Sequence, residues 1–138
     1  MASPRSAKAL VDQRQKFERR IATALETEDD PLDVYVQFVQ WITENYDAGD
    51  SNSGLTELLR KATEAFKGDP NYKADLRYLK LWSLYTKRVP TPTALKIWTN
   101  LVGKEIGTTY SLLYEEFAAV LEASGRRVFH LQAYTPHL

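Results

Sequence analysis

The sequence predicts an all-α fold of about six antiparallel helices. Apolar residues recur at three-and-four spacing along most of the chain, which is the period of an amphipathic helix. Short runs rich in Gly, Pro, Asp and Asn separate these stretches and are typical of turns. No stretch of alternating apolar and polar residues is long enough for a strand, so we expect the turns to join helices.

The first two helices are predicted from two apolar stripes with a turn between them. A helix over about residues 6–25 carries on one face Leu10, Phe17, Ile21 and Leu25. Asp30 followed by Pro31 is typical of an N-cap and a first helical turn, so the second helix begins there. Its apolar residues are Leu32, Tyr35, Phe38, Val39, Trp41, Ile42 and Tyr46. We expect the turn-forming run 47–54 that follows to be the most flexible internal segment.

The third and fourth helices are predicted over about residues 55–66 and 75–87. Gly68 and Pro70 end the third helix, because neither residue favours a helix interior. The fourth helix has a wider apolar arc than one buried face needs, made by Leu76, Tyr78, Leu79, Leu81, Trp82 and Tyr85. Such an arc indicates contact on two sides of the helix.

The fifth and sixth helices follow a proline-rich turn. Thr91 is expected to cap the fifth helix, and Gly103 to close it. Gly107 lies in the next link, where it can adopt a turn conformation that a larger residue would resist. The sixth helix is expected over about residues 109–123, with Gly125 as its C-terminal stop.

The length of 138 residues favours one domain, residues 1–138. Neighbouring helices form pairs whose lengths are near the ~34 residues of tetratricopeptide repeats. Trp41 and Trp82 recur about one helix pair apart, although no pair meets the full repeat consensus. We therefore predict a short tetratricopeptide-like helical-repeat array rather than a closed bundle.

Composition argues against several classes of function. Eighteen basic residues balance 18 acidic ones, so the net charge provides no field to attract nucleic acid or an anionic membrane. Cysteine is absent, which fits a reducing compartment and removes thiol chemistry. No apolar stretch is long enough for a signal peptide or a membrane span. We expect neither nucleic acid nor membrane as a partner.

Candidate catalytic groups are few. The two histidines, His130 and His137, lie in the tail after the last predicted helix. A metal site or a Ser-His-Asp set needs more ligands or a well-positioned His. The adjacent carboxylates of Glu115 and Glu116 point apart on a helix and do not face each other across a pocket. We therefore expect no enzyme activity, no metal and no cofactor.

Aromatic residues are numerous, with three Trp, eight Tyr and five Phe. Most should be core residues, but the arc of the fourth predicted helix leaves room for exposed ones. Exposed aromatic side chains are candidate anchors for a partner protein. In the alternative interpretation, neighbouring helices bury both sides of this helix, as in a stacked repeat array.

Several separated motifs follow one another as they do in one known family. They are Asp30-Pro31-Leu32-Asp33, Tyr35-x-x-Phe38-x-x-Trp41-x-x-Glu44-Asn45-Tyr46, Leu58-Leu59-Arg60-Lys61-Ala62, Tyr72-Lys73-x-Asp75-x-Arg77-Tyr78-Leu79-x-Leu81-Trp82, Ile106-Gly107-Thr108 and Tyr114-Glu115-Glu116-Phe117-Ala118. Together they resemble the N-terminal tetratricopeptide-like domain of the Bub and Mad spindle-assembly-checkpoint proteins. The resemblance covers about residues 16–125, whereas the tail 126–138 departs from the family.

This resemblance implies a non-enzymatic module that acts in mitosis in the nucleus, at kinetochores, with the cytoplasm as the other compartment. Its helical surface would take up a short helical motif of a kinetochore scaffold protein. By the resemblance, Glu64, Trp82 and Tyr85 match the family's contact surface, and the apolar arc adds Leu81. The repeat pattern alone leaves a second hypothesis open, a half-tetratricopeptide scaffold for another assembly such as RNA processing.

Overall fold

The structure is all-helical over the residues that it describes. It is a computed structural model that describes the backbone of residues 4–132 and the side chains of residues 7–125. Within residues 4–132 the chain forms six α-helices, two short 3-10 helices and no strand, which confirms the predicted fold class. The chain divides into two compact units, Met1–Ala62 and Thr63–Leu138, and the division falls within the third α-helix. The single domain over 1–138 stays a prediction.

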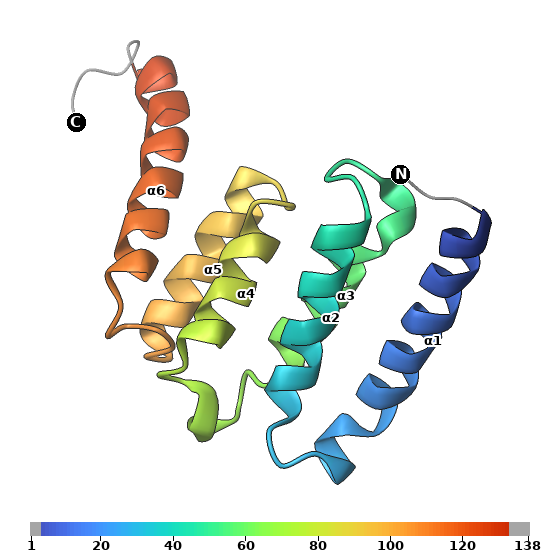
Figure 1. Ribbon diagram of the computed structural model, residues 1–138. Helices are drawn as coiled ribbons and strands as arrows, with labels where there is room; N and C mark the ends of the chain where they lie inside the picture. Colours follow the sequence, from blue (N-terminus) through green and yellow to red (C-terminus); the bar gives the residue numbers. More distant parts are fainter. Residues whose placement is uncertain (1–3, 133–138) are drawn as a thin grey trace. The chain divides into compact units, whose positions relative to one another are not determined.

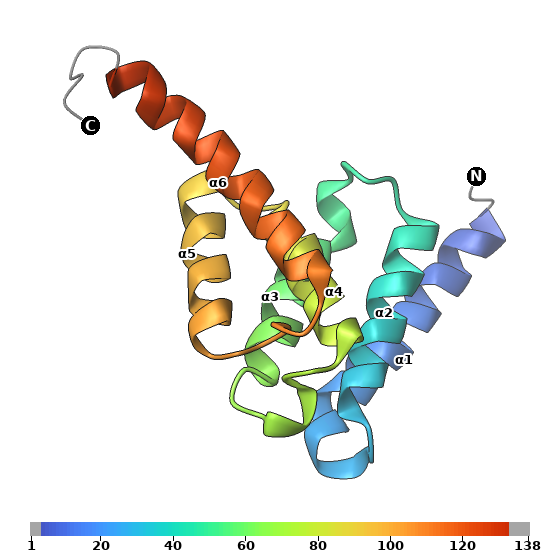
Figure 2. The same ribbon diagram turned by 90° about the vertical axis from the view of Figure 1, so that its left-hand side faces the viewer.

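The first unit contains α1 (Pro4–Thr27), α2 (Pro31–Asn45), the 3-10 helix η1 (Ser51–Ser53) and most of α3 (Leu55–Ala65). Helices α1 and α2 lie side by side and antiparallel (Figures 1 and 2). Their predicted apolar stripes meet at Phe17 and Phe38, whose rings stack with centroids 4.9 Å apart, whereas Leu25 of the predicted α1 stripe is 59% exposed. Trp41 packs at the edge of this pair, 5.7 Å from the Phe17 centroid.

Arg14 of α1 ties down the run 47–54. Its Nη1 donates a hydrogen bond to the backbone carbonyl of Ser53 at 2.7 Å. The same guanidinium lies 5.6 Å from the Phe38 ring centroid and 5.8 Å from that of Tyr46, within the range of a cation–π contact. The run expected to be the most flexible internal segment is therefore anchored at the buried Ser53.

The second unit contains the end of α3, η2 (Pro70–Tyr72), α4 (Leu76–Thr86), α5 (Thr91–Gly103) and α6 (Ser111–Gln132). Helix α5 runs antiparallel to α4 and to α6, and α6 continues past the end of α5 (Figures 1 and 2). The core of this unit is aromatic and aliphatic. Its fully buried side chains include Phe66, Tyr78, Leu79, Trp82, Trp98, Leu101 and Leu113.

Two predicted helix ends were wrong. Helix α6 passes through Gly125 and ends at Gln132, not near Ala123. Glycine inside a helix costs only about 1 kcal/mol relative to alanine, and Gly125 lacks the positive φ of a helix-ending glycine. The N-cap of α5 is Pro90, in an extended conformation, and not Thr91. The side chains of His130 and His137 lie outside the described residues.

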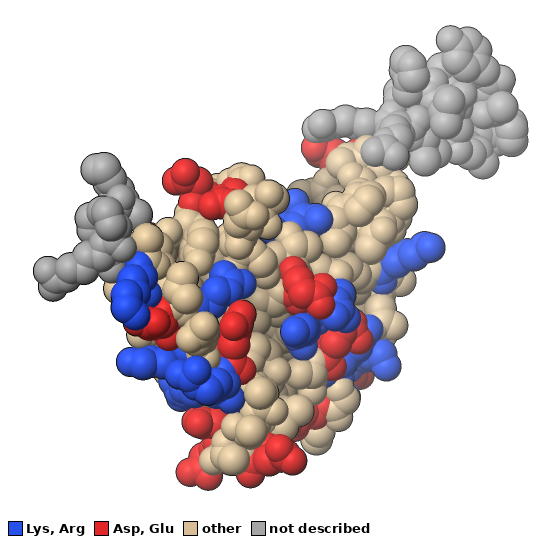
Figure 3. Space-filling model, turned by 90° about the vertical axis from the view of Figure 1, so that its right-hand side faces the viewer, with Lys and Arg blue, Asp and Glu red and all other residues tan. Residues whose placement is uncertain are grey.

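Basic and acidic residues, which are equal in number in the sequence, are also mixed on the surface (Figure 3). On the face shown in Figure 3, Lys and Arg side chains are intermixed with Asp and Glu side chains. None of the helices in the described part of the chain has the length and apolar character needed to cross a bilayer.

Gly107 joins α5 to α6 in the conformation that the sequence predicts. Its φ is 74°, in the left-handed region that favours glycine. Its N–H donates a hydrogen bond to the carbonyl of Lys73 at 2.7 Å, so the link packs against the segment that leads into α4. A Cβ at this position would lie 2.8 Å from Cδ1 of the buried Leu79.

We predict that Gly107→Ala lowers the free energy of unfolding by about 2 kcal/mol or more, because strain at positive φ adds to the clash with Leu79. Gly49→Ala is the matched control, since no atom lies within 4 Å of a Cβ there and φ is not positive. Urea denaturation of both variants measures the difference. Equal stability of the two would contradict the role given to Gly107.

Candidate functional site

Helix α4 positions three of the predicted site residues, Leu81, Trp82 and Tyr85, whereas Glu64 lies in α3. Asp75 caps it, with Oδ1 accepting a hydrogen bond from the backbone N–H of Arg77 at 2.9 Å. One side of the helix faces the end of α3, where the Tyr78 hydroxyl donates to the carbonyl of Thr63. Burial raises the pKa of Tyr78 well above its ordinary value, so the hydroxyl stays protonated and remains a donor.

Besides Leu79, three other members of the wide apolar arc are buried. Tyr78 is 1% exposed, Leu81 3% and Trp82 1%. Trp82 lies between the rings of Tyr78 and Tyr85, at centroid distances of 6.1 and 6.2 Å. The alternative of burial on both sides therefore holds for these three residues. Leu81 and Trp82, expected as exposed anchors, offer a partner almost no surface.

Glu64 and Tyr85 remain accessible. Glu64 is exposed and pairs with Lys67, at 3.6 Å between Oε2 and Nζ, while Tyr85 is half-buried. The same Nζ lies 5.6 Å from the Trp82 ring centroid. Lys67 thus contacts both Glu64 and Trp82, and Trp82 contacts Tyr85, so the structure brings the three predicted residues together. Their part in partner binding, and that of Leu81, stays a prediction.

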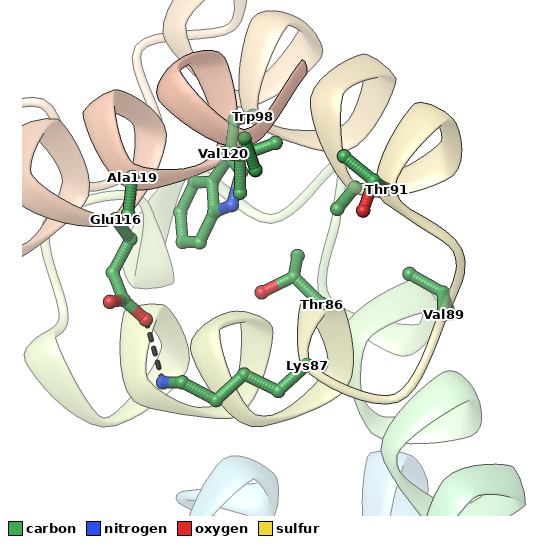
Figure 4. A pocket seen from close by; sticks show the side chains of 10 residues that line it. Thr86, Lys87, Val89, Thr91, Trp98, Glu116, Ala119 and Val120 are labelled. Atoms are coloured by element: carbon green, nitrogen blue, oxygen red, sulfur yellow. Dashed lines mark hydrogen bonds and ion pairs between the residues drawn. The ribbon is translucent and has the colours of Figure 1, made fainter. Parts of the chain in front are cut away.

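On another side of α4, a cavity of about 280 Å³ opens between three helices. Figure 4 shows it between the end of α4, the start of α5 and the middle of α6. Its lining residues are Thr86, Lys87, Val89, Thr91, Ala94, Trp98, Glu116, Ala119, Val120 and Ala123. The reasoning from sequence missed this cavity. The available signal was the i, i+3, i+4, i+7 spacing of the four α6 residues, which places them on one helix face.

A polar group from α6 reaches α4 at the edge of the cavity. Oε1 of Glu116 lies 2.7 Å from Nζ of Lys87, and the Ser83 hydroxyl donates to the same oxygen (Figure 4 shows the Lys87 contact). Partial burial raises the pKa of the Glu116 carboxyl, but the hydrogen bonds from Lys87 and Ser83, together with the positive charge of Lys87, lower it by more. The net pKa lies below its ordinary value, so Glu116 is charged at neutral pH.

The indole of Trp98 forms part of the cavity floor. Its Nε1–H is buried and has no hydrogen-bond partner among the described residues. In Figure 4 this nitrogen is on the side of the ring that faces Thr86 and the cavity. A buried donor without a partner costs about 1–3 kcal/mol, so the floor holds an unused capacity for a hydrogen bond.

This arrangement supports binding. Three alanines and two valines among the lining residues leave room for an inserted side chain. Within the described part of the chain, no three His, Cys, Asp or Glu residues gather closely enough to hold a metal ion. Glu116, the one carboxylate among the described residues that line the cavity, is held by Lys87 and Ser83.

Comparison with known proteins gives a consistent result. The family model described as Mad3/BUB1 homology region 1 matches residues 12–134. This range is wider than residues 16–125, over which the sequence motifs show the resemblance. The mitotic spindle checkpoint component mad3 of Schizosaccharomyces pombe is 36% identical over 117 residues, which are 84% of this chain and 37% of that protein. The mitotic checkpoint serine/threonine-protein kinase BUB1 beta of Homo sapiens is 32% identical over 114 residues, 83% of this chain and 10% of that protein.

Two solved structures share the fold. A chain in the crystal structure of a mitotic checkpoint complex is 34% identical with a TM-score of 0.79, covering 89% of this chain and 56% of that one. The conserved N-terminal domain of the mitotic checkpoint component BUB1 is 30% identical with a TM-score of 0.78, and the match covers 86% of this chain and 64% of that one. This second match confirms the predicted tetratricopeptide-like fold. The chain spans about a third of the length of mad3 and about a tenth of the length of BUB1 beta.

We predict that Trp82→Ala lowers the free energy of unfolding by about 3–5 kcal/mol, because it empties a fully packed site between Tyr78 and Tyr85. Tyr85→Ala should lower the free energy of unfolding by less, since the Tyr85 side chain is only half-buried. Urea denaturation of both variants measures this difference. A Trp82→Ala variant as stable as the wild type would show that the side chain is not core.

We also predict that the Glu116 contacts stabilise the fold in a pH-dependent way. A pKa lowered from its ordinary value of 4.5 gives stability that is present above that pH and lost as pH falls through the folded pKa. The free energy of unfolding of the wild type should exceed that of Glu116→Gln by about 1 kcal/mol near neutral pH. Urea denaturation at several pH values should show this difference shrinking below about pH 4.5. Glu115→Gln, at the exposed neighbouring position, is the control, and a pH-independent difference would contradict the assignment.

Proposed function

The chain belongs to the Mad3/BUB1 homology region 1 family, and we propose that it docks a short helical motif of a kinetochore scaffold protein. The family is that of spindle checkpoint proteins, and its homology region 1 is a non-catalytic N-terminal domain. The kinase domain of BUB1 lies elsewhere and is not in this chain. The likeness inferred from the ordered sequence motifs is thereby confirmed.

The cavity between α4, α5 and α6 is the observation that carries the proposal. A guest helix binds a groove by inserting apolar side chains at three-and-four spacing. The cavity has a volume of about 280 Å³, and its walls come from side chains such as Val89, Ala94 and Val120. One bulky side chain of the guest fills such a space, while the rest of the guest lies along the surface.

The small residues of α6 favour close approach. Ala119 and Ala123 are one turn apart on the cavity face of α6, so the guest meets little steric obstruction there. Lys87 and Glu116 neutralise each other at the edge, and the whole chain has no net charge. Binding should therefore depend mainly on apolar burial and only weakly on salt.

The predicted contact residues have two roles in this proposal. Tyr85 and Thr86 lie in the last turn of α4 and point to different sides of it, so a guest has to cross the end of the helix to contact both Tyr85 and the cavity. Glu64 extends the contact as an exposed carboxylate beside Lys67. Leu81 and Trp82 act from beneath, since their burial holds α4 and the Tyr85 ring in place. We place the action of this chain in the nucleus, at kinetochores.

We predict that Ala119→Leu, which fills the cavity, weakens binding of the scaffold-protein peptide by roughly tenfold, a loss of about 1.4 kcal/mol. Ala118→Leu is a matched control, because Ala118 is the exposed neighbour on the same helix and does not line the cavity. Isothermal titration calorimetry measures both affinities.

Equal affinities of the two variants would place the guest elsewhere. Absence of binding by the wild-type chain at high micromolar peptide would reject the docking function itself. Thermal melting of both variants checks that any loss of affinity does not come from unfolding.

A further inference from the structure

The cavity contains a directional polar feature that apolar docking leaves unused. The Trp98 Nε1–H lies in the cavity floor and has no acceptor among the described residues, in a side chain that is 0% exposed. An unpartnered buried donor favours any adjustment that lets an acceptor reach it. The cavity beside it is the nearest space that such an acceptor can enter (Figure 4).

We infer that the guest inserts a side chain that ends in an uncharged hydrogen-bond acceptor, the amide of Asn or Gln, which accepts from Trp98 Nε1. This inference rests on the proposed docking function, because it assigns the chemistry of the side chain that enters the same cavity. An amide carbonyl accepts the hydrogen bond, and the apolar stem of the side chain packs against Val120 and Ala94.

The charge of Glu116 in the cavity disfavours a guest side chain that ends in a carboxylate. Glu116 lines the same space, and a second carboxylate there would face a like charge in a partly dehydrated site. Lys87 does not offset the second charge, since its ammonium already pairs with Glu116 at 2.7 Å and bonds the Ser83 hydroxyl oxygen at 2.9 Å. A neutral acceptor avoids this cost and still satisfies the indole.

A purely apolar guest is also disfavoured. A hydrocarbon side chain in the cavity would leave the Trp98 donor unpaired, as it is in the free chain, and would gain no hydrogen bond from it. Thr86 does not replace the guest, because its hydroxyl donates to the carbonyl of Ser83 and makes no hydrogen bond with the indole. The floor therefore discriminates between an amide and a branched hydrocarbon group of similar size.

The test uses the ¹⁵N-labelled full chain and follows the indole Nε1–H signals of its three tryptophans by NMR. The probe is butyramide, a small molecule with the amide and stem of a glutamine side chain. We expect a saturable downfield shift of the Trp98 signal. Trp82 is an internal control, since its Nε1–H is also buried but Trp82 does not line this cavity.

Two isosteric probes separate the chemistries. Pentan-2-one, a neutral acceptor that has no donor, should shift the Trp98 signal as butyramide does. Butyrate should bind roughly tenfold more weakly, because its charge faces Glu116. Glu116→Gln should reduce this penalty against butyrate.

Three results would overturn the inference. They are no Trp98 response at tens of millimolar butyramide, an equal response of Trp82, and equal binding of butyrate and butyramide. Trp98→Phe removes the donor and should abolish the preference for acceptor probes; if this variant does not fold, the wild-type signals decide alone.

The scaffold-protein peptide distinguishes the inference from the docking proposal. A peptide that binds without moving the Trp98 indole signal rejects the inference and keeps the docking function. A peptide that fails to bind, while butyramide still shifts Trp98, rejects the docking function and leaves the cavity chemistry in place.

Discussion

Helix α4 has to bury large side chains on opposite sides at the same time, and the geometry of the second unit follows from this requirement. On one side, Tyr78 and Trp82 pack in a row of edge-to-face rings that begins at Phe66. On the other, Leu79 packs against the link at Gly107, and Ser83 receives the carboxylate of Glu116 from α6. A helix fixed on both sides cannot rotate about its axis. The orientations of Tyr85 and Thr86 at its end are therefore set by packing.

Periodicity was sufficient to predict the helices, because apolar spacing and turn residues are local properties of the sequence. It also predicted the conformation at Gly107, where only a residue without Cβ fits. The end of α6 was missed because Gly125 can either stop a helix or be carried through one, and its flanking sequence does not decide between these outcomes. Whether a broad apolar arc is exposed depends on the elements that pack against it. The burial of Leu81 and Trp82 therefore required the structure.

The cavity shows why the candidate site was harder to predict than the fold. Its walls come from the end of α4, the following link, α5 and α6, so its residues are spread between Thr86 and Ala123. Taken separately, each of these segments has an ordinary helical pattern. The cavity exists because the small side chains of Ala94, Ala119 and Ala123 meet at one place. Only the three-dimensional arrangement reveals this coincidence, since no single stretch of sequence contains it.

Buried anchors change how a loss of binding should be interpreted in this family. A substitution at Trp82 removes packing between α4 and its neighbours, so it can displace Tyr85 and the cavity without the indole ever touching a guest. A substitution at Ala119 changes the cavity and leaves the aromatic row intact. Loss of affinity at Trp82 is therefore weak evidence for a contact, whereas loss at Ala119 with unchanged stability is strong evidence. The contact surface of a stacked helical array has to be defined by positions of the second kind, because its most conspicuous aromatic residues hold the stack together.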